Sequence, residues 1–245
     1  MDIEISVNTK NDVMRERFLL GAKLTGKYGF PQLPAVIVHA DGLRSVPFNL
    51  ALKERNPKEC ICHFFIDDMQ FERVWNNPDK YIPALQNFKY VCAPDFSFYE
   101  DMPLAMQIWQ VYRSRALAWY LLINGVNVVP VAGWSNAASF GWCFDGLPQQ
   151  SSIALSSVGC VRADLSKRCF SAGYSELIER VNGARVVLFG EKIVSGNVDQ
   201  FPTFSNEIQK RIKGGAIEWA ADRERRKEQR IYTELELCAK QKKTK

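Results

Sequence analysis

Acidic residues follow two apolar segments of the chain, at the points where each segment ends. Asp67 and Asp68 come directly after CICHFFI, and Asp95 comes directly after YVCAP, with Phe96 and Phe98 beside it. A carboxylate among aromatic side chains can have a raised pKa and act as a general acid, a general base or a nucleophile. Neighbouring residues of a strand point to opposite faces, so at most one of Asp67 and Asp68 enters a shared cavity. We expect that residue and Asp95 to be catalytic.

These carboxylates also have a structural interpretation. Asp67 and Asp68 can bind backbone amides at the start of a loop, and Asp95 can hold its turn through an Asx hydrogen bond. Two successive apolar segments that both end in Asp favour the functional interpretation.

Other polar residues near segment ends are candidates for substrate binding. The loop VAGWSNAASFGWCFDG (131–146) places Trp134 beside Ser135 and Asn136. Aromatic, amide and hydroxyl groups together can stack on a sugar or nucleobase and hydrogen-bond its edge, although each ring taken singly can equally belong to the core. The remaining candidates are Ser97, Ser157, Glu191, Arg113 and Arg115. The two arginines lie in a largely apolar helical segment, where one can pair with a sheet carboxylate or contact an anion.

Several other chemistries lack the residues that they need. Both histidines, His39 and His63, lie inside apolar segments, where a hydrogen-bonded core histidine is the usual outcome. Cys60 and Cys62 have no second cysteine pair at zinc spacing, and no G-x-S-x-G motif supports a serine nucleophile. We therefore expect neither a metal nor a cofactor.

The elements that position these residues are alternating strands and helices. Helical segments are expected at 45–55, capped by Ser45, at 101–125, capped by Asp101, and at 164–183. Six apolar segments are expected as strands, at 35–40, 60–67, 90–95, 126–134, 152–159 and 185–190. Most of them are continuously apolar, which is typical of parallel strands covered on both faces.

This alternation predicts an α/β fold with a parallel sheet, and two arrangements are open. No glycine-rich phosphate loop follows the first strand, so the best mark of an open doubly wound sheet is missing. Polar and aromatic residues instead recur at strand ends, as in barrel enzymes. We favour a TIM-barrel-like fold, complete or incomplete, with an open doubly wound sheet as the alternative.

The charge distribution divides the chain of 245 residues into an α/β domain (1–204) and a basic helical extension (205–245). Residues 210–245 contain twelve Lys or Arg and six Asp or Glu, a balance of +6, so the remainder is close to −1 of the total +5. We expect the extension to be a solvated or protein-binding helix, or to contact nucleic acid.

No apolar run is long enough for a membrane span, and the N-terminus has no secretory pattern. Seven cysteines without a disulfide framework indicate a reducing compartment. We expect the protein in the cytoplasm, which is that of the host if a phage encodes it.

Several motifs resemble a family of bacteria, phages and other mobile elements that is described as a domain of unknown function. They are FIDDMQFERVWNNPDKY (65–81), VCAPDFSFYEDMPLAMQIWQVYRSR (91–115), GVNVVPVAGW (125–134), FDGLP (144–148) and GY with VVLFG (173–190). The resemblance covers roughly residues 35–192 and brings no activity with it. It implies only that Asp67, Asp68, Asp95, Ser97, Arg113, Arg115 and Trp134 occupy motif positions.

A looser resemblance connects the order of these segments with barrel enzymes that exchange guanine for a deazaguanine in tRNA or phage DNA. It implies glycosyl or base transfer, or hydrolysis, on a nucleotide or nucleic-acid base, with strand-end carboxylates as catalysts. The chain lacks the zinc-binding cysteines of those enzymes, and a fold-level likeness is weak evidence for function. The alternative is a non-enzymatic protein that sequesters a small ligand or a host protein.

Overall fold

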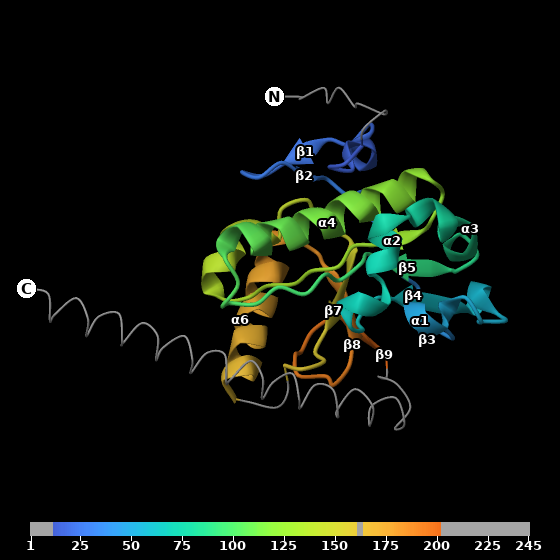
Figure 1. Ribbon diagram of the computed structural model, residues 1–245. Helices are drawn as coiled ribbons and strands as arrows, with labels where there is room; N and C mark the ends of the chain where they lie inside the picture. Colours follow the sequence, from blue (N-terminus) through green and yellow to red (C-terminus); the bar gives the residue numbers. More distant parts are fainter. Residues whose placement is uncertain (1–11, 161–163, 202–245) are drawn as a thin grey trace, which may run out of the picture. The chain divides into compact units, whose positions relative to one another are not determined.

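The computed structural model describes residues 12–160 and 164–201, and its labelled elements are shown in Figure 1. The strands are β1 (Leu24–Thr25), β2 (Phe30–Pro31), β3 (Arg44–Pro47), β4 (Cys60–His63), β5 (Tyr90–Cys92), β6 (Val128–Val129), β7 (Ser152–Ser156), β8 (Arg185–Phe189) and β9 (Val198–Phe201). The α-helices are α1 (Phe48–Ala51), α2 (Glu72–Asn76), α3 (Ile82–Leu85), α4 (Leu104–Ile123), α5 (Phe140–Cys143) and α6 (Asp164–Arg180). Short 3-10 helices are η1 (Glu16–Leu19), η2 (Pro57–Glu59), η3 (Asp68–Gln70), η4 (Pro78–Lys80) and η5 (Ala137–Ser139).

The strands pair in the order in which they occur along the chain. A parallel sheet has the order β3-β4-β5-β6, and a second parallel sheet has the order β7-β8-β9. An isolated parallel bridge between Val131 and Ala154 connects the two sheets. Its hydrogen bonds run from the Ala132 amide to the Ala154 carbonyl (3.1 Å) and from the Ala154 amide to the Pro130 carbonyl (2.8 Å). The predicted α/β class with parallel strands is confirmed.

The described strands form an open series. No ladder joins β9 to β3 within residues 12–160 and 164–201, so these residues show no closed barrel. A doubly wound sheet reverses its strand order at a switch point, and no such reversal occurs between β3 and β9.

The two faces of the second sheet pack against different partners. Leu155 and Leu188 share a buried cluster with Phe170 and Leu177 of α6. Their neighbours in sequence point the other way, because side chains alternate along a strand. Ala154, Val187 and Phe189 accordingly belong to the cluster built on β3–β6, together with Phe201 of β9, which is paired with Phe189. Both faces are therefore buried, which explains the continuous apolar runs in this part of the sequence.

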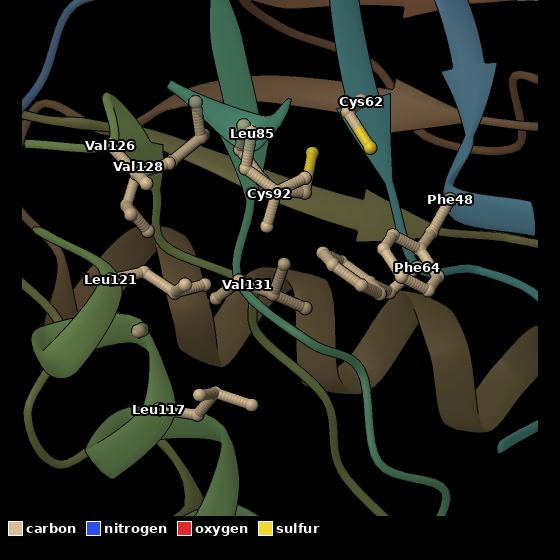
Figure 2. Packing of buried hydrophobic residues seen from close by; sticks show 14 of the residues in the cluster. Phe48, Cys62, Phe64, Leu85, Cys92, Leu117, Leu121, Val126, Val128 and Val131 are labelled. Carbon is tan, nitrogen blue, oxygen red and sulfur yellow. The ribbon is translucent and has the colours of Figure 1, made fainter. Parts of the chain in front are cut away.

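The main core is formed by the first sheet and by helices on it (Figure 2). Leu117 and Leu121 of α4 and Val128 of β6 belong to one cluster with Cys62 of β4 and Cys92 of β5. Both thiols are buried, and burial raises the pKa of each. These thiols therefore act as small apolar side chains.

Helix α4 is covered on two sides. It contacts β6 and also η1 and β2, and Figure 1 shows the β1–β2 hairpin on one side of it and the sheet strands on the other. Its sequence is consequently apolar on most faces. The helix follows Pro103 as N-cap, not the predicted Asp101, and ends before Asn124 and Gly125, whose φ of +80° suits glycine.

Some predicted elements were wrong or too long. Residues 35–40 form no strand; the Val36 and Val38 amides donate to the hydroxyls of Ser151 (3.0 Å) and Ser152 (2.9 Å). Ser45 lies in β3 and not at a helix start, and α1 begins at Phe48. The predicted extension (205–245) lies outside the described residues, and the domain boundary stays a prediction. In the part of the chain that is described, no helix is long and apolar enough to cross a bilayer.

Candidate functional site

The candidate site lies at the carboxyl ends of the parallel strands. Strand β4 ends at His63 and β5 ends at Cys92, and the two strands are paired in parallel. Asp68 and Asp95 follow these ends and are therefore brought to the same edge of the sheet. The loop after β6 supplies Gly133 to the same place, since an added Cβ on Gly133 would lie 3.8 Å from the Asp95 Oδ1 atom.

Asp68 is held by the loop that follows β5. Its Oδ2 atom accepts a hydrogen bond from the Ser97 amide (3.0 Å), and its Oδ1 atom accepts one from the Ser97 hydroxyl (2.8 Å). The Ser97 carbonyl accepts a hydrogen bond from Gln110 Nε2 of α4 (2.9 Å). Burial raises the pKa of Asp68, while both hydrogen bonds from Ser97 oppose that rise. The carboxylate therefore has a fixed orientation.

Asp95 has a different environment. It lines a small cavity of about 10 Å³ together with Phe96, Phe98, Gly133 and Cys143. No hydrogen-bond donor from the described residues reaches its carboxylate. The pKa of Asp95 is raised to about 7: burial is the largest cause, the negative charge of Asp68 also raises the pKa, and the positive charge of Arg115 opposes the rise. Both forms of this carboxyl group are therefore present at neutral pH.

Arg115 is a buried cation that holds loops together. It is 2% exposed, and its guanidinium donates to the carbonyl oxygens of Val131 (2.8 Å), Cys143 (3.2 Å) and Asp145 (3.2 Å). Burial lowers the pKa of Arg115 to about 10, so it remains charged at neutral pH. Arg115 thus fixes the loop after β6 and supplies positive charge near Asp95 without a direct ion pair.

Arg113 pairs with a carboxylate that sequence reasoning did not identify. Its Nη2 atom forms a short ion pair with Glu72 of α2, and its Nη1 atom donates to Gln110 Oε1 (3.3 Å). The guanidinium carbon lies 3.8 Å from the centroid of the Phe96 ring, a cation–π contact. Arg113 and Gln110 therefore connect α2 to Ser97, and through Ser97 to Asp68.

The aromatic loop makes mainly internal contacts. Trp134 Nε1 donates to the Cys169 carbonyl of α6 (3.1 Å), and its ring packs against Phe144 and Phe170. The Ser135 hydroxyl donates to Gln107 Oε1 of α4 (2.7 Å). Asn136 caps η5 by accepting a hydrogen bond from the Ala138 amide (3.0 Å). Substrate binding by Trp134, Ser135 and Asn136 stays a prediction.

Two further predicted residues lie at the next strand ends. The Ser157 hydroxyl, after β7, donates to the Glu191 carbonyl, after β8, at 2.9 Å. This hydrogen bond uses the backbone of Glu191, and its side chain is exposed. Their role in binding likewise stays a prediction.

The structure thus brings Asp68, Asp95, Ser97 and Arg115 together and leaves Asp67 outside. Asp67 is exposed and caps η3 by accepting a hydrogen bond from the Met69 amide (3.0 Å). Sequence reasoning missed Gln107 and Gln110, which hold two of the loops. The sequence signal for them is that they are polar residues in a helix, α4, that is otherwise largely apolar.

The described residues contain no cluster of three or more His, Cys, Asp or Glu side chains that could hold a metal ion. His63 is buried, and burial lowers its pKa to about 3. A larger cavity, of about 440 Å³, lies elsewhere, against η1 and the N-terminal turns of α4.

Comparison with known proteins identifies relatives in phages. The chain is 33% identical over 165 residues to the Gene 1 protein of Mycobacterium phage D29, an alignment that covers 65% of this chain and 60% of the relative. It is 33% identical over 153 residues to the Gene 1 protein of Mycobacterium phage L5, covering 60% of this chain and 67% of the relative. The chain thus spans about 60% to 67% of these relatives. No solved structure matches it significantly.

A family match extends beyond the motifs recognised in the sequence. It covers residues 22–205, and so includes both the β1–β2 hairpin and β9. Because this match covers most of the chain, the chain belongs to the family described as Domain of unknown function (DUF4417).

Proposed function

We propose that the protein is an enzyme of a phage or another mobile element, in which Asp95 is the general acid–base. The observation that carries this proposal is Asp95 itself, at a strand end with a pKa of about 7. A group that gives and takes protons in one cycle works best when its pKa lies near the operating pH. Strand ends of parallel α/β folds are also the usual place for catalytic residues.

Asp68 is the second carboxylate of the proposed site. Its negative charge raises the pKa of Asp95, so the two groups act on each other. Two hydrogen bonds from Ser97 orient Asp68 and favour its ionised form. Two carboxyl groups in different environments can divide the acid–base role and the nucleophilic or charge-stabilising role. We assign the first to Asp95, the second to Asp68, and no catalytic role to Asp67.

The proposed substrate is a nucleotide or a nucleic-acid base, and the proposed reaction is glycosyl or base transfer or hydrolysis. Phe96 and Phe98 line the cavity beside Asp95, where aromatic rings can contact a base. Trp134, Ser135 and Asn136 belong to the proposed binding loop, and they would have to exchange their present contacts for contacts to substrate. The basic extension (205–245) is proposed to contact phosphate or a protein partner.

We propose that the strands form an incomplete TIM-barrel-like sheet. Successive strands from β3 to β9 are neighbours, as in a barrel, and Phe189 and Phe201 from the end of this series share a cluster with β3 and β4 residues. These observations support an incomplete barrel.

Turnover assays with the full-length protein test the enzymatic proposal. Nucleosides, nucleotides, single-stranded DNA and tRNA are incubated with the protein, and released bases or sugars are measured by mass spectrometry. We expect Asp95→Asn to lower turnover by about 10² to 10⁴-fold with substrate affinity retained. Asp67→Asn is the matched control and keeps turnover. Equal turnover in wild type and Asp95→Asn contradicts the assignment.

One observation favours the alternative, a non-enzymatic binding protein. The cavity beside Asp95 has a volume of about 10 Å³, enough for about one water molecule and not for a base. A catalytic site would therefore need a movement of its loops. Mass spectrometry of small molecules that co-purify with the protein separates the two functions: a sequestering protein releases its ligand unchanged, and an enzyme converts it.

A further inference from the structure

A second surface feature lies on a different face of α4 from the strand-end site. It is a groove with a volume of about 440 Å³, formed by the segment around η1, the β1–β2 hairpin and the N-terminal turns of α4. We call it the α4 groove and define it by Met14, Glu16, Tyr28, Phe30, Trp109 and Tyr112. None of these residues touches the cavity beside Asp95, so the groove is independent of the proposed reaction.

The α4 groove is rich in exposed apolar and aromatic groups. Trp109 is 38% exposed and stacks on Tyr112, with ring centroids 5.3 Å apart. Met14 is 60% exposed, and apolar residues nearby in sequence, Val13 and Met106, are 83% and 51% exposed. Single exposed apolar residues are common, but a contiguous group marks an interaction site. Trp, Tyr and Met are also the residues that are enriched at the centres of protein interfaces.

The exposure of its walls indicates the kind of occupant. Small-molecule sites bury most of their ligand, whereas Met14, Ala105 and Trp109 leave the groove open to solvent. An open apolar surface of this type fits a protein partner better than a small molecule.

The charges at the α4 groove are complementary to each other. Glu16 lines the groove, and no ion pair or hydrogen bond reaches its carboxylate from the described residues. Lys27 precedes Tyr28 and is exposed; its ammonium lies 5.4 Å from the Tyr28 ring centroid and forms no ion pair with a carboxylate of the described residues. A two-fold interface places one patch against an identical patch, so an acid and a base that lie on the same surface can each meet the opposite charge on the second copy.

We propose that the α4 groove is the surface through which two copies of this chain associate about a two-fold axis. Trp109 anchors the contact, and Glu16 of each copy faces Lys27 of the partner subunit.

Analytical ultracentrifugation of the full-length protein, over a range of concentrations, tests this proposal. We expect reversible dimers, and we expect Trp109→Ala to raise the dimer dissociation constant about 30-fold or more. Leu165→Ala is the matched control, because Leu165 is an apolar residue of α6 that is 79% exposed, and it leaves the constant unchanged. Trp109 also contacts Trp75, so Trp109→Phe and circular dichroism show whether a loss of dimers reflects misfolding.

A charge exchange tests the two-fold arrangement itself. Glu16→Lys and Lys27→Glu each place like charges across the contact and should raise the dissociation constant about tenfold. The double variant restores opposite charges and should restore dimers. A mixture of the two single variants should form heterodimers in preference to either homodimer.

The outcomes that overturn the proposal are distinct. A wild-type protein that stays monomeric at about 100 μM lacks the association. Dimers that respond to none of these variants use another surface, such as residues 205–245. A protein that is monomeric at full length and dimerises only after residues 1–11 are deleted also overturns the proposal, because the groove of the full-length chain is then not free for a second copy.

Discussion

Two neighbouring strand ends carry the same kind of side chain in opposite surroundings. After β4, Asp68 accepts two hydrogen bonds from Ser97, and these oppose the effect of burial on its pKa. After β5, Asp95 meets no donor from the described residues, and its pKa rises to about 7. The local supply of donors therefore distinguishes an orienting carboxylate from a proton-transferring one, although both follow a buried parallel strand.

The two arginines of α4 show the same contrast. Arg113 forms an ion pair with Glu72 and stacks on Phe96, so its positive charge is balanced by a carboxylate of the protein. Arg115 binds three carbonyl oxygens and keeps its charge available near Asp95. Loss of Arg113 should loosen the contacts that hold Ser97 and Asp68. Loss of Arg115 should free the loop after β6 and remove a positive charge that lowers the pKa of Asp95.

The largest effect on this comparison is expected from Arg115→Met. The change leaves three buried carbonyl oxygens without their donor, and should lower the free energy of unfolding by about 3 to 5 kcal/mol. Urea unfolding at pH 7 measures this loss. Arg180→Met is the control, because Arg180 forms a surface ion pair with Glu176, and it should cost less than about 0.5 kcal/mol. Similar losses in both variants would contradict a structural role for Arg115.

Asp95→Asn is expected to stabilise the protein at alkaline pH. The native pKa of about 7 lies above the usual 3.8, so between these pH values the native state binds more protons than the unfolded state. Stability therefore falls as the pH rises from about 4 to about 7 and is level above that range. Removing the charge should add about 4 kcal/mol at pH 8, because each unit between the two pKa values contributes about 1.4 kcal/mol, and nothing at pH 4. A pH series of unfolding experiments measures this difference, and a constant difference at all pH values would refute it.

Ser97→Ala should make Asp68 more like Asp95. It removes the hydroxyl donor at 2.8 Å and leaves the amide donor at 3.0 Å, so the pKa of Asp68 should rise. The expected loss of stability is about 1 kcal/mol. Carbon-detected NMR titration of the aspartate carboxyl groups measures the pKa. Ser175→Ala, at an exposed position of α6, is the control and should leave it unchanged.

The smallest expected effect distinguishes the roles of the adjacent residues Asp67 and Asp68. Asp68→Asn removes the charge that raises the pKa of Asp95, so that pKa should fall. Asp67→Ala should leave it unchanged and lower stability by about 0.5 kcal/mol through the lost cap of η3. The same NMR titration decides between them. A larger shift of the Asp95 pKa in Asp67→Ala than in Asp68→Asn would show that the assignment to Asp68 is wrong.

The strands could be predicted from the sequence where burial on both faces alone determines the pattern of apolar residues. The apolar runs at β4, β5, β7 and β8 identify strands because both faces of these strands are covered. Residues 35–40 have the same pattern and form no strand: the Ser152 amide donates to the Val36 carbonyl (2.7 Å), but the Val36 and Val38 amides donate to serine hydroxyls at 151 and 152 and not to a neighbouring backbone. Strand β3 escaped prediction because RSVP is short and half polar, and β6 stops at Pro130, which has no amide hydrogen.

The site could be predicted only in part, for a related reason. Asp68 and Asp95 are predictable because they follow strand ends that are visible in the sequence. The alternation of side chains along a strand predicts that one of Asp67 and Asp68 faces away from a shared cavity, but not which one. The contacts of Gln107 and Gln110 depend on the packing of α4 against loops that are distant in sequence. Trp134 was expected as a ligand platform, but its contacts with α6 depend on a helix thirty or more residues further along.

The order of the strands also has a consequence for how the protein assembles during synthesis. Each strand from β4 to β6, and each from β8 to β9, pairs with the strand that left the ribosome just before it. The sheet can therefore grow in the direction of translation without waiting for distant segments. The hydrogen bond from Val38 to Ser152 spans 114 residues, so it is formed only when β7 has emerged. We therefore expect this hydrogen bond to form late in folding. Until β7 has emerged, the segment around Val38 cannot bind its partner.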